Sequence, residues 1–331
     1  MVALGTGDSS GRNSPQPLVK FPITAAFLGP EGTYTHQAAY ELFGEGAKYV
    51  AKNTISETYK SVSTASSPTF CVIPAENSIF GTVTETYDLL RGPEVGVETF
   101  IRGECQIGVR HCLVVRRGVK LEDITKIASH EQALGQCSQF ISTHLPHATL
   151  SRATSTAAAA RSLLEDQGDG WKQRAAICSR ICIKLYAGLE IIWEGIQNSQ
   201  NNYTRFFVLS AKGVTLPSPP PESPLGKLQR RALLRIALPA TAAVTSTGTE
   251  PPITLSTVLP ALLHPALFVN RIDRRPSLLC QPFHDYVYIE LQAVATEKED
   301  TGAGWAKALE SVMAGVKVAV GTGEVVRLGT W

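Results

Sequence analysis

The sequence lacks any apolar run near the roughly 20 residues that a membrane-spanning helix needs. Charge of one sign is not in excess either, because the net charge is only +2 and no long basic run occurs. Nucleic acid normally requires a clustered basic face, so we expect no nucleic-acid partner. Residues 1–21 show neither an apolar signal segment nor an Arg-rich amphipathic pattern. We therefore expect a flexible tail there, and a cytoplasmic protein without a membrane partner.

Spacings typical of metal sites and disulfide frameworks are also missing. The seven cysteines are an odd number, and most lie in apolar runs such as residues 69–73, as buried thiols of a reducing compartment do. Cys178 and Cys182 are four residues apart on an expected helix, but no second ligand pair accompanies them. The chain contains no GxGxxG, Walker, HExxH or GxSxG motif. We therefore expect neither a metal nor a cofactor.

What is present is a globular composition, with 44% hydrophobic and 18% charged residues, in a chain of 331 residues. That length predicts two or three folding units. Between residues 22 and 211, short apolar runs alternate with helical patterns, which predicts parallel sheets covered on both faces. A long β-type run at 103–116 interrupts the alternation and could carry the chain into a second sheet. The expected fold class is therefore α/β with two lobes.

A Pro-rich linker at 212–228 precedes a different pattern at 229–331. The order of elements there is βαββαβ, which is ferredoxin-like, with a flexible insert at 241–252. The expected elements are a strand at 232–238, a helix at 255–263, strands at 267–272 and 286–292, a helix at 305–313 and a strand at 316–320.

Polar segments follow the expected strands in the first region. After the strand at 23–28, a glycine turn opens a helix with Thr33 and Thr35, which could bind an anion or simply cap the helix. Glu76 and Asn77 follow a buried strand, where α/β folds place ligands or polar turns. Ser129 precedes a helix, and the spacing to Gln132 predicts a capping box there.

Further along, Gln136 lies about one turn into that helix. Ser155 and Thr156 open an alanine-rich helix whose small residues permit close approach. Thr204 and Arg205 begin a β-type run, where Arg205 could clamp a carboxylate or form a surface ion pair. These segments together could bind a small acid without dinucleotide, ATP or metal.

Five of these segments, in this order, resemble the prephenate dehydratase family: GPEGTYTHQAA, PAENSIFGTVTETYDLL, SHEQALGQC, TSTAAA and NNYTRFFVL. The resemblance covers residues 26–210. It implies a cleft between two lobes like those of type-2 periplasmic binding proteins. It also implies conversion of prephenate to phenylpyruvate, CO2 and water in L-phenylalanine biosynthesis, by a carbon–oxygen lyase.

The resemblance carries residue roles with it. It implies four catalytic residues, which are Thr204, Asn77, Ser129 and Gln136. It implies substrate contacts at Thr33, Thr35, Glu76, Ser155, Thr156 and Arg205.

Residues 229–331 resemble an ACT regulatory domain. Segment 270–277 keeps Arg275 and Pro276 of the ESRP motif, and segment 255–259 is a degraded GALV motif in which Ser256 stands at the glycine. The implied effector contacts are Ser256, Val258, Arg275 and Pro276. The resemblance implies L-phenylalanine as an allosteric inhibitor, weakened by the lost glycine. It also implies a homodimer or a dimer of dimers.

Two alternatives stay open. An arogenate dehydratase would share the fold and the chemistry, although the lack of a recognisable transit peptide favours prephenate. A non-catalytic amino-acid sensor is the second, and the retained Thr204 and Asn77 argue against it. No long helical segment precedes residue 26, so we do not expect a chorismate mutase fusion.

Overall fold

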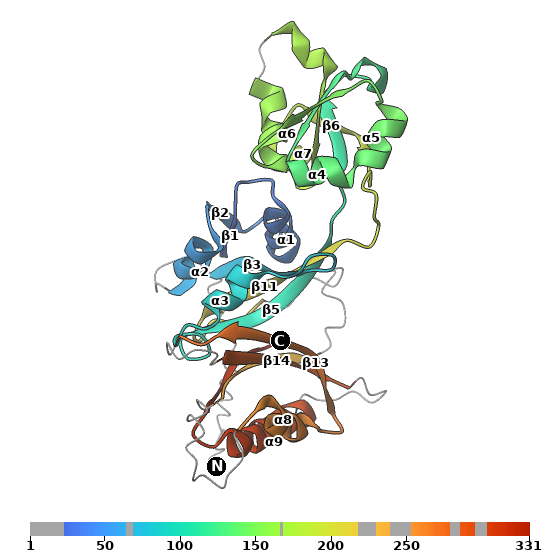
Figure 1. The fold of residues 1–331 in the computed structure, drawn as a ribbon. Helices are drawn as coiled ribbons and strands as arrows, with labels where there is room; N and C mark the ends of the chain where they lie inside the picture. Colours follow the sequence, from blue (N-terminus) through green and yellow to red (C-terminus); the bar gives the residue numbers. More distant parts are fainter. Residues whose placement is uncertain are drawn as a thin grey trace, which may run out of the picture.

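The computed structural model describes residues 23–63, 69–165, 168–217, 230–238, 253–278, 285–294 and 303–331. The chain forms two lobes and a C-terminal unit, which are stacked along the long axis of the molecule (Figure 1). The expected N-terminal tail, residues 218–228 of the linker, the 241–252 insert and Cys280 lie outside the described residues. Within the described ranges, no helix is both long enough and apolar enough to cross a membrane.

The first lobe is built on a mixed sheet. Its strands are β1 (Thr24–Leu28), β2 (Lys48–Lys52), β3 (Phe70–Asn77), the short β4 (Gly81–Thr82), β5 (Thr99–Gly108) and β11 (Tyr203–Ala211). Strands β1, β2 and β3 run parallel, and β11 lies antiparallel between β3 and β5. Helix α1 (Tyr34–Phe43) packs on one face of the sheet, and α2 (Ile55–Ser63) and α3 (Thr84–Leu89) pack on the other.

The second lobe, residues 112–194, has a separate five-stranded sheet of order β10-β6-β9-β7-β8. Its strands are β6 (Cys112–Arg116), β7 (Lys126–Ser129), β8 (Thr149–Arg152), β9 (Arg174–Cys178) and β10 (Leu189–Glu194). Its helices are α4 (Glu131–Gln136), α5 (Ser138–His144), α6 (Thr156–Glu165) and α7 (Ile181–Leu185). The chain enters this lobe between β5 and β6 and returns between β10 and β11, so the predicted two-lobe α/β fold is confirmed.

The C-terminal unit has the predicted βαββαβ order. Its elements are β12 (Arg231–Ala237), α8 (Leu255–Val258), β13 (Leu267–Pro276), β14 (Asp285–Ala293), α9 (Ala303–Val320) and β15 (Glu324–Thr330). Helices α8 and α9 cover the face of its sheet that is remote from the lobes (Figure 1). The other face packs on the first lobe, where Tyr288 and Leu233 share a core with Phe207. A single pairing of Gly329 with Ile101 joins this sheet to β5.

The prediction of a strand at 316–320 is wrong, because α9 continues to Val320. A run of valines favours a strand, but Val312, Val316 and Val320 recur every four residues and are all buried on one helix face. Gly321, at φ 56°, then ends the helix, and the last strand is β15.

Other differences concern element boundaries. Strands β2 and β10 and helix α2 were not predicted from the sequence. The helix expected after Ser129 is two helices, α4 and α5, that meet at Cys137. The expected buried thiols are confirmed for the six cysteines within the described ranges, all of which are free and buried.

Candidate active site

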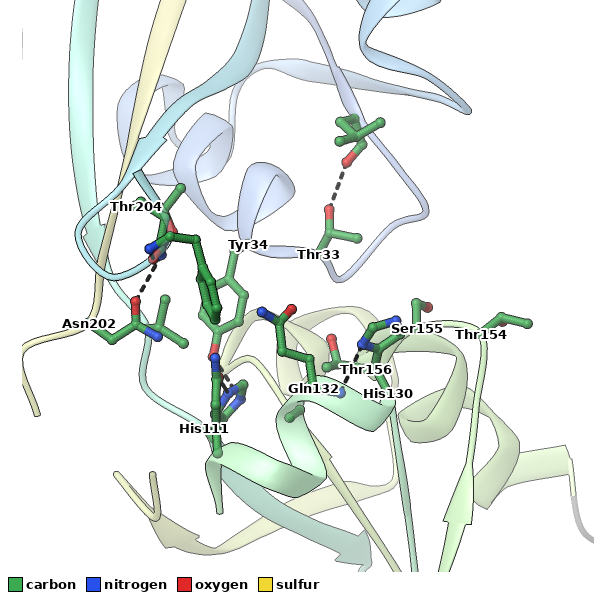
Figure 2. Close-up of a pocket in the computed structure, with 16 residues that line it drawn as sticks. Thr33, Tyr34, His111, His130, Gln132, Thr154, Ser155, Thr156, Asn202 and Thr204 are labelled. Atoms are coloured by element: carbon green, nitrogen blue, oxygen red, sulfur yellow. Dashed lines mark hydrogen bonds between the residues drawn. The ribbon is translucent and has the colours of Figure 1, made fainter. Parts of the chain in front are cut away.

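A cavity of about 490 Å3 lies between the two lobes and is lined by sixteen residues (Figure 2). The first lobe contributes Leu28, Thr33, Tyr34, Asn77, Phe80 and Thr204. The second lobe contributes His130, Gln132, Ala133, Gln136, Thr154, Ser155 and Thr156, and the two connections contribute Val109, His111 and Asn202. None of these side chains is a carboxylate, an ammonium or a guanidinium, so the described lining combines polar and apolar groups and carries no permanent charge.

Thr204 and Asn77 are paired neighbours at the ends of β11 and β3. The Asn77 amide Nδ2 donates to Thr204 Oγ1 at 3.1 Å and to Asn202 Oδ1 at 2.8 Å. Its Oδ1 accepts from the backbone N–H groups of Ile79 and Phe80, at 2.9 and 3.1 Å. Because the Thr204 oxygen already accepts one hydrogen bond, its own O–H proton is available for the cavity. Asn77 therefore orients Thr204 rather than offering a free donor itself.

A second polar chain crosses the cavity from lobe to lobe. Gln136 Oε1 lies 2.8 Å from His111 Nε2, and His111 Nδ1 lies 3.1 Å from the Tyr34 hydroxyl. Burial lowers the pKa of His111, although the hydrogen bond to Gln136 opposes that shift. Burial also raises the pKa of Tyr34 well above its usual range. Near neutral pH, both side chains are therefore uncharged.

Two ten-residue helices, α1 and α6, begin at the cavity from opposite lobes. Thr33 caps α1, with Oγ1 accepting from His36 N at 3.3 Å and donating to Leu28 O at 2.8 Å. Ser155 Oγ accepts from Ala158 N at 3.0 Å in the first turn of α6. The positive ends of both helix dipoles thus face the same space, which favours an anionic ligand.

Small residues bring these two helix starts together. A Cβ added to Gly32, which has φ 89°, would lie 2.9 Å from both Ala157 Cβ and Cys182 Sγ across the lobe boundary. Ser179 Oγ donates to Gly32 O at 2.7 Å over the same boundary. The close approach that the alanine-rich segment predicted is therefore an approach of the second lobe to the glycine turn of the first.

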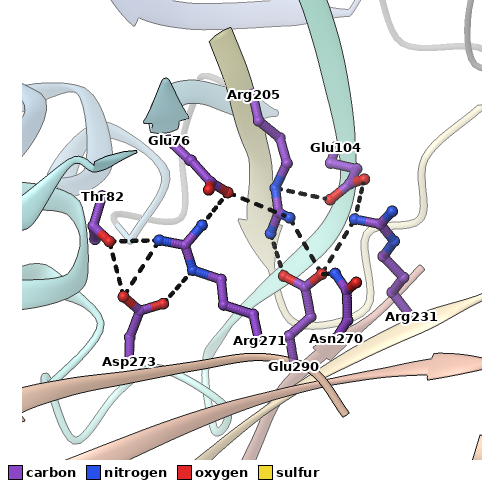
Figure 3. Close-up of polar contacts among 9 residues, drawn as sticks. All are labelled: Glu76, Thr82, Glu104, Arg205, Arg231, Asn270, Arg271, Asp273 and Glu290. Atoms are coloured by element: carbon purple, nitrogen blue, oxygen red, sulfur yellow. Dashed lines mark hydrogen bonds and ion pairs between the residues drawn. The ribbon is translucent and has the colours of Figure 1, made fainter. Parts of the chain in front are cut away.

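Glu76 and Arg205, which the resemblance implied as substrate contacts, do not line the cavity. Each precedes or follows a cavity residue on its strand, so its side chain points to the opposite face of the sheet. There Arg205 forms ion pairs with Glu290 and with Glu104, whose Oε2 lies 3.3 Å from Arg205 Nε, and Glu76 pairs with Arg271 (Figure 3). The structure therefore gives both residues a role between the first lobe and the C-terminal unit.

We call this group the interunit charge cluster (Figure 3). Its members are Glu76, Thr82, Glu104, Arg205, Arg231, Asn270, Arg271, Asp273 and Glu290. Glu290 is fully buried on β14, where Asn270 donates to it at 2.6 Å and Arg231 at 3.2 Å. Arg231 also lies 2.9 Å from Glu104. Burial raises the pKa of Glu104, and its two arginine partners oppose the shift.

Ser129 and Thr35 also lie outside the cavity lining. Ser129 is fully buried and donates from Oγ to Ile177 O at 2.6 Å, which extends the pairing of β7 with β9. The predicted capping box is wrong, because the N-cap of α4 is His130, whose side chain accepts from Gln132 N. The helix begins one residue later than the pattern suggested, so the hydroxyl faces the sheet. Thr35 is buried in α1.

The residues implied as effector contacts make other contacts within this chain. Val258 is fully buried in the core of the C-terminal unit. Arg275 pairs with Asp88 of α3 through Nε–Oδ1 and Nη2–Oδ2 hydrogen bonds of 2.6 and 3.0 Å, and Pro276 O accepts from Arg91 at 3.0 Å. Ser256 is exposed, and its hydroxyl lies 2.7 Å from that of Thr254.

Several cavity residues were not anticipated as site residues from the sequence. They are Tyr34, His111, His130, Gln132, Thr154 and Asn202. His130 and Asn202 lie inside segments that the sequence did single out, and the sequence left open only whether their side chains face the cavity. His111 precedes an apolar strand without any motif of its own, and its place at the lobe connection is visible only in the fold.

The family model for prephenate dehydratase matches residues 25–214, which is more than half of the chain. The chain belongs to the prephenate dehydratase family. Curated relatives include the bifunctional chorismate mutase/prephenate dehydratases of Neisseria gonorrhoeae, 38% identical over 191 residues, and of Aquifex aeolicus, 35% identical over 191 residues. These matches cover 58% and 57% of this chain. The chain spans about half the length of these relatives, 50% and 49% respectively.

Solved structures agree with the fold. A prephenate dehydratase from Arthrobacter aurescens, in complex with L-Phe, is 27% identical, with a TM-score of 0.69 over 93% of this chain and 89% of that one. A protein described as a novel type of quorum quenching acylase, GqqA, is 25% identical, with a TM-score of 0.67 over 93% and 96%.

Proposed function

We propose that the chain is a prephenate dehydratase, which converts prephenate to phenylpyruvate, CO2 and water in L-phenylalanine biosynthesis. The observation that carries the proposal is the Thr204–Asn77 pair, held in a cavity between two helix N-termini. Prephenate carries two carboxylates, and the described lining offers backbone N–H groups and neutral donors instead of competing acids. The family match to residues 25–214 supports the same reaction.

The chemistry needs little beyond binding and one proton. The C4 hydroxyl leaves and a carboxylate is lost as CO2, and the ring becomes aromatic, so the reaction is strongly favourable. The departing hydroxide takes up one proton to become water. Thr204 can donate a hydrogen bond to that leaving oxygen, because Asn77 has fixed its acceptor side. A threonine is a weak acid, so it acts as one donor within a preorganised set.

An acylase activity, the one named for GqqA, fits this cavity less well. That chemistry needs a nucleophile within hydrogen-bond reach of a general base. Asn77 Nδ2 donates to Thr204 Oγ1, and an amide nitrogen cannot accept the hydroxyl proton in return. His111 Nε2 faces the amide oxygen of Gln136, and the hydroxyl at its Nδ1 is that of Tyr34, whose pKa burial raises well above its usual range and which is therefore hard to deprotonate.

The test is turnover of prephenate and of arogenate by the full chain and by Thr204 variants. We expect prephenate to be the better substrate. Thr204→Val should lower kcat by about a hundredfold or more, the usual scale for a positioned donor, and Thr204→Ser should recover part of the rate. Thr149→Val, on the exposed strand β8, is the matched control. Turnover of neither substrate would refute the proposal, and a preference for arogenate would change the substrate. A Thr204→Val rate equal to that of the control would make Thr204 structural.

We also propose the division of the chain into a dehydratase region at 22–211, a linker at 212–228 and an ACT regulatory domain at 229–331. The βαββαβ order of the C-terminal unit supports it, as does the L-Phe complex of the Arthrobacter aurescens protein. L-Phenylalanine is the proposed inhibitor. A homodimer, or a dimer of dimers, would let two such units form an effector site between them. A cytoplasmic location, without nucleic acid as a partner, is part of the same proposal.

A further inference from the structure

His111 lies at the connection by which the chain enters the second lobe, and only 2% of its surface is exposed. Each ring nitrogen faces a polar neighbour, Gln136 Oε1 at 2.8 Å from Nε2 and the Tyr34 hydroxyl at 3.1 Å from Nδ1. Tyr34 belongs to α1 of the first lobe, and Gln136 to α4 of the second. Figure 2 shows Tyr34 and His111 meeting at the cavity. One imidazole therefore connects two cavity residues from opposite lobes.

The partners determine where the proton sits on the ring. An amide oxygen can only accept, so His111 Nε2 must carry the hydrogen that meets Gln136 Oε1. In the neutral ring Nδ1 is then an acceptor, and the Tyr34 hydroxyl donates to it. Burial favours the neutral ring by lowering the pKa of His111. The chain of donors thus runs in one direction, from Tyr34 through His111 to Gln136.

The backbone of His111 is also tied to the second connection between the lobes. Its N–H donates to Gln197 Oε1 at 3.0 Å, and its carbonyl accepts from Gly195 N at 2.9 Å and from Ile196 N at 3.2 Å. Residues 195–202 form that returning connection. Because the N–H and the carbonyl of His111 are both hydrogen-bonded, the backbone that carries the ring is fixed in place. The imidazole can therefore hold the Gln136 side chain in one orientation.

We propose that His111 is a positioning residue, which holds the Gln136 carboxamide so that its NH2 group, not its oxygen, meets the substrate. The proposal rests on the proposed dehydratase function. The terminal amide torsion of glutamine is soft and roughly two-fold, so nothing intrinsic to Gln136 decides which end faces the cavity. His111 decides it by binding the oxygen. Without the imidazole, the amide can turn its oxygen toward a dianionic substrate and repel it.

Kinetics of four variants test this. His111→Leu should lower kcat by about tenfold to a hundredfold, somewhat less than the loss of a preorganised donor itself. His111→Gln, which can place an amide N–H near the former Nε2, should recover most of that loss. Gln136→Leu should be impaired, and adding His111→Leu to it should cost nothing more, because His111 acts through Gln136. His147→Leu, at an exposed histidine, is the control and should match wild type. Two results would overturn the proposal. One is a double variant whose loss of kcat is the product of the two single losses, and the other is a kcat of His111→Gln no higher than that of His111→Leu.

A spectroscopic measurement separates this proposal from the proposed function. Long-range 1H–15N correlation spectra of the histidine rings in the full chain should show His111 as the Nε2–H tautomer. Gln136→Leu should alter that signal, and His147→Leu should leave it unchanged. An Nδ1–H tautomer would mean that the amide is turned round, and the proposal would fail. If wild type turns over neither prephenate nor arogenate, the dehydratase function fails, while the tautomer still tests the hydrogen-bond arrangement.

Discussion

Replacing Glu290 by glutamine should destabilise the chain strongly, although Glu290 does not line the cavity. Glu290 is fully buried on β14, and it accepts hydrogen bonds from Arg205, Arg231 and Asn270. At the centre of the interunit charge cluster, Arg205 and Arg231 face the buried carboxylates of Glu104 and Glu290, and the partly exposed Glu76 lies 3.8 Å from Arg205. Glu290→Gln removes the fully buried carboxylate, so that Arg205 and Arg231 share Glu104 as their one remaining buried counterion.

The magnitude follows from that imbalance. Removing one partner of a buried ion pair typically costs about 3–5 kcal/mol, because the remaining charge stays desolvated. Glutamine keeps one oxygen that can accept from Arg205 or Asn270, so we expect the lower end, about 3 kcal/mol. The loss should fall on the packing of the C-terminal unit against the first lobe, since Glu290 and Arg205 belong to different units.

Urea unfolding followed by fluorescence and circular dichroism is the assay, with Glu165→Gln as the matched control. Glu165 pairs with Arg161 at 3.0 Å on the surface, and each side chain is 62% exposed. That pair should contribute only about 0.2–1 kcal/mol. If Glu290→Gln costs no more than Glu165→Gln, the Glu290 carboxylate is not a buried counterion of Arg205 and Arg231. A double-mutant cycle with Arg205→Met should show strong coupling, and additive effects would contradict the direct pairing.

Three further predictions concern the lobes and control. Ser129→Ala should lower the free energy of unfolding by about 1–3 kcal/mol, because the Ile177 carbonyl loses its buried donor. The kcat should change little, and a large loss of kcat with unchanged stability would contradict this prediction. Burial lowers the pKa of His36 to about 4, so the unfolded state binds more protons below pH 6.5. Stability should therefore fall between pH 6.5 and 4, by about 2 kcal/mol at pH 5 from this group, and urea titrations of His36→Gln should lack that share. L-Phenylalanine should inhibit weakly, and Ser256→Gly should strengthen the inhibition. If calorimetry gives the same affinity for L-phenylalanine in wild type and Ser256→Gly, Ser256 does not weaken the effector site.

Much of the fold could be predicted, because local patterns and tertiary packing agree there. The strand at 24–28 is apolar, the glycine turn follows, and Thr33 caps α1 as its residue type predicts. The β-type run near residues 103–116 does change sheets between β5 and β6. By contrast, the valines at 312–320 fit either a strand or a helix face. The core of the C-terminal unit decides for the helix, because Leu309 and Val316 both pack into it.

The site was harder to predict, because adjacent residues on a strand serve different parts of the molecule. Thr204 and Arg205 are consecutive in one motif, and the sequence suggested a substrate role for both. A strand alternates its side chains, so one residue faces the cavity between the lobes while the next faces the C-terminal sheet. Which residue faces which side depends on the register of β11 between β3 and β5, including an irregularity after Arg205. Because β14 supplies Glu290 to the far face, the strand that presents Thr204 to the cavity is held from behind by the C-terminal unit.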